Sequence, residues 1–86
     1  MVILGKGDTI LTDDDRLGVV VKSVRYSEKQ SDGGGSVCAV RFPQNPADAR
    51  IFVFESHGYN FCLSDNLSII QVNRGEKTIW RLAHET

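Results

Sequence analysis

The chain has 86 residues, with ten Lys and Arg against eleven Asp and Glu, a formal net charge of −1 and 41% hydrophobic residues. This length predicts one domain, residues 1–86, with a small core. The hydrophobic share is too high for a disordered chain, and no apolar run approaches the roughly 18 residues of a membrane span. The balanced charge provides no general field to attract nucleic acid. We therefore expect a cytoplasmic protein that does not bind membranes.

Seven short runs rich in β-branched and aromatic residues predict extended segments, separated by Gly, Pro, Asn and Asp. In chain order they are residues 7–12, 17–26, 37–42, 50–56, 61–63, 68–72 and 78–83. Alternation places Cys38, Val40 and Phe42 on one face of their strand, and Phe52 and Phe54 on one face of theirs.

The connections between these runs carry their own signals. Residues 27–36 contain three successive glycines and predict a flexible hairpin loop. Residues 43–49 hold both prolines and predict a turn, because proline cannot donate a ladder hydrogen bond. Residues 64–67 predict one 3₁₀ turn capped by Ser64 or Asp65. Gly75 is expected to take a positive φ in the last hairpin.

No window of the chain has the periodicity of an amphipathic helix, so the predicted fold class is all-β. Six or so short strands and a late 3₁₀ turn favour a small SH3-like barrel of five to seven strands. The opening Gly7-Asp8-Thr9-Ile10, followed by Gly18-Val19-Val20, resembles the SH3-like superfold. That superfold hosts many unrelated functions, so the resemblance implies a fold and no activity. An OB-like barrel is the alternative.

The two cysteines, Cys38 and Cys62, are too few for a disulfide framework, and we expect both as reduced thiols. With His57 and His84 they are the residue types of a zinc site, but their spacing differs from that of structural zinc sites. The Asp13–Asp15 run does not fit a calcium loop, and the glycine run lacks the Lys-Ser/Thr of a phosphate-binding loop. We expect neither a metal nor a cofactor.

The resulting hypothesis is a non-catalytic binding or adaptor module that contacts a protein partner and self-associates, most simply as a dimer. Its expected contact residues are Arg and aromatic side chains, with the 31–36 loop as an adaptable edge. They are Arg25, Tyr26, Arg41, Arg50, Tyr59 and Trp80.

Two other function classes remain open from the sequence. An exposed group of Arg25, Arg41 and Arg50 beside aromatic residues would suit a nucleic-acid-binding barrel. A minimal enzyme with its site at an oligomer interface would use Cys62 as nucleophile, His57 as base and Asp65 as orienting carboxylate. We expect the binding module rather than an enzyme.

Overall fold

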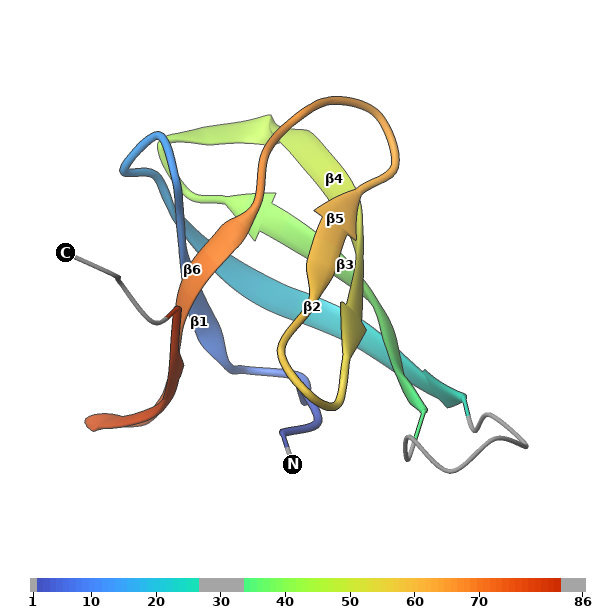
Figure 1. Cartoon of the computed structure of the whole chain (residues 1–86). Coiled ribbons are helices and arrows are strands. Elements are labelled where there is room, and N and C mark those ends of the chain that lie inside the picture. Colours follow the sequence, from blue (N-terminus) through green and yellow to red (C-terminus); the bar gives the residue numbers. More distant parts are fainter. Residues whose placement is uncertain (1, 27–33, 83–86) are drawn as a thin grey trace, which may run out of the picture.

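A computed structural model describes residues 2–26 and 34–82, which form seven β-strands and no helix (Figure 1). All neighbouring strands are antiparallel. Residues 27–33, which hold most of the predicted flexible loop, lie outside the described residues. The strands are β1 (Thr9–Thr12), β2 (Leu17–Tyr26), β3 (Gly35–Phe42), β4 (Asn45–Glu55), β5 (Asn60–Cys62), β6 (Ile69–Arg74) and β7 (Lys77–Arg81).

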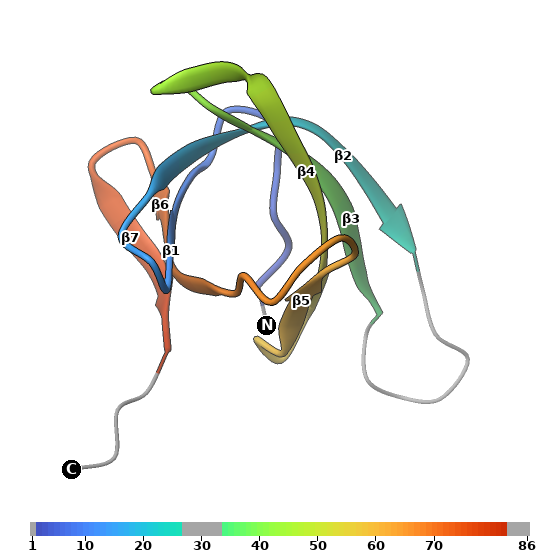
Figure 2. The same cartoon turned by 90° about the horizontal axis from the view of Figure 1, so that it is seen from above.

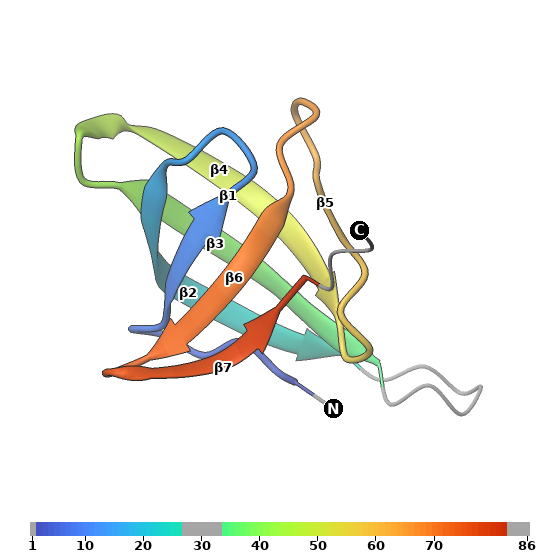
Figure 3. The same ribbon diagram turned by 60° about the vertical axis from the view of Figure 1, so that its left-hand side comes forward.

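The strands form one sheet in the order β5-β4-β3-β2-β1-β6-β7, and this sheet curls into a small open barrel (Figure 2). Strands β1 to β5 follow one another in chain order, and β6 then returns to pair with the free edge of β1. The all-β barrel prediction is confirmed, and this strand order agrees with its SH3-like form. Figure 3 shows β6 and β7 crossing β2 and β3 at a large angle.

The core is built from the inward positions of alternating strands. Phe42, Phe52 and Phe54 are at most 1% exposed, as are Val40 and Cys38. The predicted alternation in residues 37–42 and 50–56 is therefore confirmed. The remaining buried apolar side chains are Leu4, Ile10, Val20, Cys62, Leu67, Ile69 and Val72.

Two predicted connections are wrong in detail. Residues 43–49 are not only a turn, because β4 begins at Asn45 and includes Pro46. The β3–β4 register passes from Asn45 directly to Ala49, so this bulge removes the ladder position that would need an N–H from Pro46. Residues 63–66 form bends, and the predicted 3₁₀ turn over residues 64–67 is absent. Asp65 does cap this segment, since its Oδ1 accepts a hydrogen bond of 2.9 Å from the Leu67 N–H.

The side chain of Asn60 joins the edge strand β5 to β6, the neighbour of the opposite edge strand β7. Its Nδ2 donates to the Ile69 carbonyl at 3.0 Å, and its Oδ1 accepts from the Ile69 N–H at 2.8 Å. The amide thus forms the two hydrogen bonds that a paired backbone residue would form, and it links β5 to β6, which do not pair through their backbones. Nearby, the Trp80 ring of β7 meets the buried Phe54 ring edge-on, with centroids 5.0 Å apart.

We predict that Asn60→Asp lowers the free energy of unfolding by about 1–3 kcal/mol, because it removes a donor and places a carboxylate beside the Ile69 carbonyl. Urea denaturation followed by circular dichroism measures this change. Asn66→Asp, at an exposed site in the next loop, is the matched control and should cost much less. Equal losses for the two variants would contradict the closing role of Asn60.

The N-terminal segment, residues 2–8, crosses the ring of strands and fills one mouth of the barrel (Figure 2). Leu4 is only 2% exposed, and the Val2 N–H donates to the Ser56 carbonyl at 2.9 Å. Arg74 fastens the segment, because its Nε and Nη2 donate to the Asp8 carboxylate at 2.9 and 2.8 Å. Its Nη2 also donates to the Ile3 carbonyl at 2.9 Å.

Burial alone would raise the pKa of Asp8, but hydrogen bonds from Arg74 and the Gly5 N–H, with the Arg74 charge, hold it below its ordinary value. A lowered native pKa contributes stability above the unfolded pKa of about 3.9 and loses it as the pH falls through the native pKa. We predict that Asp8→Asn is less stable than wild type at neutral pH, and that this deficit shrinks below about pH 4. Urea titrations across this range test it, and a constant deficit would contradict the assignment.

Candidate functional site

The outward side of strands β2 to β5 carries a row of apolar side chains. The strand register aligns Val24 with Val37, Val37 with Val53, and Val53 with Phe61. Directly paired residues of antiparallel strands point to the same side of a sheet, so these four side chains lie next to one another. Their neighbours along the strands, such as Cys38 and Phe52, point into the core.

A second row continues this surface. Ile51 pairs with Ala39, and the Leu63 N–H donates to the Ile51 carbonyl at 2.9 Å. On the other side of the first row, the Tyr59 ring lies 5.9 Å from that of Phe61. We call the combined surface the apolar face, made of Val24, Val37, Ala39, Ile51, Val53, Tyr59, Phe61 and Leu63.

Much of the apolar face is open to solvent. Leu63 is 62% exposed, Tyr59 58% and Val24 55%, and Phe61, Ile51 and Val37 are each more than a third exposed. With these fractions the face leaves roughly 600 Å² of mostly apolar surface uncovered, at the top of the range for the largest patch on a monomer. Patches of this size with a polar rim mark interaction sites.

Charged residues border the apolar face at opposite ends. Exposed Lys22 pairs with Ala39, one row from Val37, and exposed Arg41 follows two residues beyond Ala39 on the same strand. At the other end, Glu55 pairs with Gly35, and His57 Nε2 lies 3.4 Å from Glu55 Oε1. The face is therefore basic at one end and acidic at the other.

The sequence itself indicates this surface, although the prediction based on Arg and aromatic residues did not identify it. Residues 51–54 read Ile-Phe-Val-Phe, and residues 37–40 read Val-Cys-Ala-Val. A strand of an antiparallel sheet with one wet face alternates apolar and polar residues, whereas a strand covered on both faces reads as a continuous apolar run. Two adjacent strands with continuous apolar runs thus indicate that the outward face of the sheet, like the inward one, is suited to burial.

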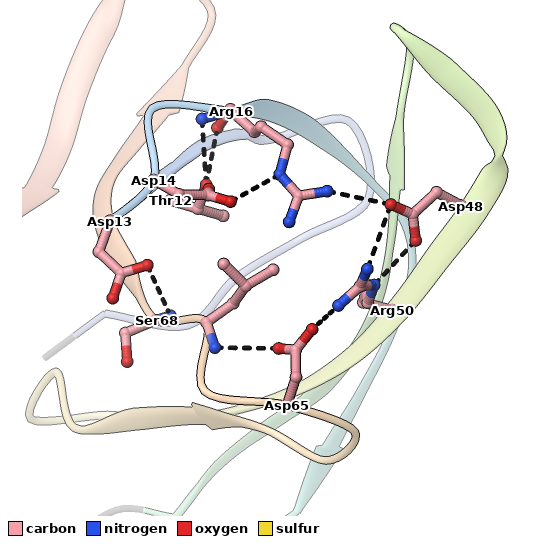
Figure 4. Close-up of polar contacts among 9 residues, drawn as sticks. Thr12, Asp13, Asp14, Arg16, Asp48, Arg50, Asp65 and Ser68 are labelled. Carbon is pink, nitrogen blue, oxygen red and sulfur yellow. Dashed lines mark hydrogen bonds and ion pairs between the residues drawn. The ribbon is translucent and has the colours of Figure 1, made fainter.

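One end of the barrel carries a chain of ion pairs from Asp14 through Arg16, Asp48 and Arg50 to Asp65 (Figure 4). Asp48 is its centre, lying 3.0 Å from Arg16 Nη1 and 2.8 Å from Arg50 Nε. These ion pairs connect the β1–β2 turn and the β5–β6 loop to β4. The guanidinium carbon of Arg16 also lies over the Phe42 ring, 4.9 Å from its centroid, so this network of ion pairs covers the core at this end.

Hydrogen bonds stabilise the charged forms of several residues in this network of ion pairs. The hydrogen bond from Arg50 lowers the pKa of Asp48, against an opposing effect of burial, and the same bond raises the pKa of Arg50. The hydrogen bond from Thr12, with a further contribution from Arg16, lowers the pKa of Asp14. Each guanidinium is matched by two carboxylates, so the arrangement supports loops and offers little free positive charge to a ligand.

The three predicted arginines do not form one group. Arg50 belongs to the ion-pair chain and pairs with Val40 on the inward side of the sheet. Arg41 is exposed on the outward side. Arg25 pairs with Ser36, five residues from Arg41 along β3, which places it about 17 Å away in the strand direction. A continuous basic surface made of these three residues is absent from the described part of the chain.

The predicted aromatic residues have three different environments. Tyr59 is exposed and lies on the apolar face. Tyr26 is half-buried at the border of that face, and a Cβ on Gly35 would lie 2.9 Å from its hydroxyl oxygen. Trp80 is half-buried against Phe54 and the core.

Among the residues considered for a catalytic or zinc site, those that the structure describes do not lie together. Cys62 is buried, with its Sγ 3.5 Å from Ser64 Oγ, while His57 is held near Glu55 and Asp65 pairs with Arg50. Burial raises the pKa of the Cys38 thiol. Over residues 2–26 and 34–82 there is neither a pocket nor a group of three metal-ligating side chains. His84 lies outside this range.

No helix that could span a membrane occurs in the described ranges. No protein-family model, curated protein or solved structure matches the chain. The class that the fold defines is a small, open, all-β barrel, and the case for its function rests on the geometry of its surfaces.

Proposed function

We propose that this protein is a non-catalytic binding module that contacts a protein partner and self-associates through the apolar face on β2 to β5. The observation that carries the proposal is the row of Val24, Val37, Val53 and Phe61, aligned across four strands on the solvent side. These four side chains are not among the buried core residues, and exposed apolar patches of this size mark interaction sites.

The composition of the face supports a protein as the bound molecule. Protein interfaces have apolar, aromatic-rich centres and polar rims, and tyrosine and phenylalanine are enriched in them. Here Tyr59 and Phe61 pack together at one side, and among the described residues the bordering charges lie at the two ends. Nucleic-acid sites instead need a basic surface with accessible guanidinium groups. The proposed location is the cytoplasm, supported by two free, buried cysteines.

The test is affinity capture with the immobilised full chain, comparing a Val37→Glu variant with a Leu17→Glu variant. Leu17 is the matched control because it is an exposed apolar strand residue, 51% accessible and seven residues from Val24 along β2. Proteins bound from an extract of the source organism, including untagged copies of this chain, are quantified by mass spectrometry.

We expect the Val37→Glu variant to lose specific partners by about tenfold or more, because a carboxylate would have to be desolvated at the centre of the face. The Leu17→Glu variant should retain them. A set of partners held equally by both variants would contradict the proposal, as would loss of binding only with Leu17→Glu.

A further inference from the structure

We propose that the apolar face is covered by the same face of a second copy of this chain, in a two-fold symmetric dimer centred on Val37. This inference rests on the proposed function and specifies the partner of the same surface. A two-fold interface requires a patch that complements itself, so that each contact occurs twice. The positions of the charges around the apolar face meet this requirement.

Lys22 and Glu55 lie at opposite corners of the face. Lys22 is on β2, in the row of Ala39, while Glu55 is on β4, in the row of Gly35. Val37 lies between them, on the middle strand β3 and in the middle row. We place a two-fold axis over Val37, within the plane where the two faces meet. The axis runs at right angles to the line from Lys22 to Glu55. Rotation about it brings Lys22 of each chain to Glu55 of the other.

The same operation places the apolar residues together. Val37 meets its own copy at the axis, and the flanking side chains of the two chains cover one another. Complete coverage of the roughly 600 Å² exposed on each chain would bury at most about 1,200 Å² in the pair, the lower end of the range for stable interfaces. A face with charges of one sign would repel its copy, whereas this face has one sign at each end.

The test is sedimentation equilibrium of the full chain from about 5 µM to about 500 µM, a range that resolves weak and moderate dimers. Wild type should show a concentration-dependent dimer. Val37→Lys should weaken it by about a hundredfold or more, because two ammonium groups would meet at the axis. Val24→Lys is a second variant in case Val37→Lys disturbs folding, and Leu17→Lys is the control that should dimerise as wild type.

Charge exchange tests the orientation. Lys22→Glu and Glu55→Lys should each weaken the dimer by about tenfold, because each places like charges together twice. The double variant should return to within about threefold of wild type, since it restores both pairs. Failure of the double variant to recover would overturn the stated axis.

A chain that remains monomeric at the highest concentration would overturn the dimer. If the Val37→Glu variant nevertheless loses captured proteins that the Leu17→Glu variant retains, binding of a protein partner through the apolar face stands, and self-association is removed from the proposed function. If the wild-type dimer survives Val37→Lys and Val24→Lys unchanged, the dimer uses another surface and this inference is wrong.

Discussion

Replacing Phe54 by alanine is expected to remove a large share of the protein's stability. Phe54 is fully buried, and its ring supports Trp80 of β7 with the two ring planes at 89°. Removing a buried phenylalanine costs about 3–5 kcal/mol, from lost burial and the cavity left behind. The whole stability of a domain this size is about 5–10 kcal/mol. Circular dichroism and urea denaturation give the fraction folded and the free energy of unfolding.

Phe61→Ala is the matched control for Phe54→Ala. Phe61 is on the neighbouring strand but faces outward and is 39% exposed, so its truncation should cost only about 1 kcal/mol when measured at low protein concentration. Phe54→Leu should fall between the two. Similar losses for Phe54→Ala and Phe61→Ala would contradict the assignment of inner and outer faces.

The second large effect is expected from Gly58→Ala in the β4–β5 turn. Gly58 has a φ of 103°, and a Cβ there would lie 2.6 Å from Trp80 Nε1. The substitution therefore combines an unfavourable backbone conformation with displacement of the ring that closes the barrel. We expect a loss of about 2–4 kcal/mol. Trp80 is the only tryptophan, so a red shift of the fluorescence emission reports its displacement directly.

Gly7→Ala separates these two causes. Gly7 has a nearly equal φ of 93°, but no atom lies within 4 Å of its would-be Cβ. Its substitution should show the backbone cost alone, about 1–2 kcal/mol, with unchanged fluorescence. If Gly7→Ala and Gly58→Ala behaved alike in both measurements, the contact between Gly58 and Trp80 would have no energetic role.

The local features of the fold were accessible from the sequence. Strand β2 has the predicted bounds, because its β-branched run follows an acidic segment and precedes a glycine-rich one. Gly75 has the predicted positive φ, 63°, in the last hairpin. The predicted placement of Phe52 and Phe54 on one face of their strand follows from simple alternation, which does not depend on distant parts of the chain.

The features that the sequence did not disclose depend on contacts between distant segments. The start of β4 depends on a bulge opposite Arg41, and no local pattern announces a bulge. Arg50 resembles a free surface cation until the β5–β6 loop brings Asp65 beside it. Asn60 looks like a turn residue, although its amide joins β5 to β6.

The apolar face was missed for a different reason. Its residues were visible in the sequence, but they alternate with core residues, and alternation alone does not tell which face of a strand is exposed. Only the register shows that Val24, Val37, Val53 and Phe61 form a single row. Tyr59 is the one predicted contact residue that lies within this face, and Tyr26 and Arg41 border it.

We propose that the apolar face is the contact surface of the protein, and methyl NMR with a soluble paramagnetic probe tests this by measuring the solvent accessibility of its side chains. Spectra at low and high protein concentration compare Val24, Val37 and Val53 with Leu17. We expect the three valines to be accessible in dilute solution and to become protected at high concentration, while Leu17 stays accessible throughout. Unchanged accessibility of all three valines, or protection confined to another surface such as β7, would contradict it.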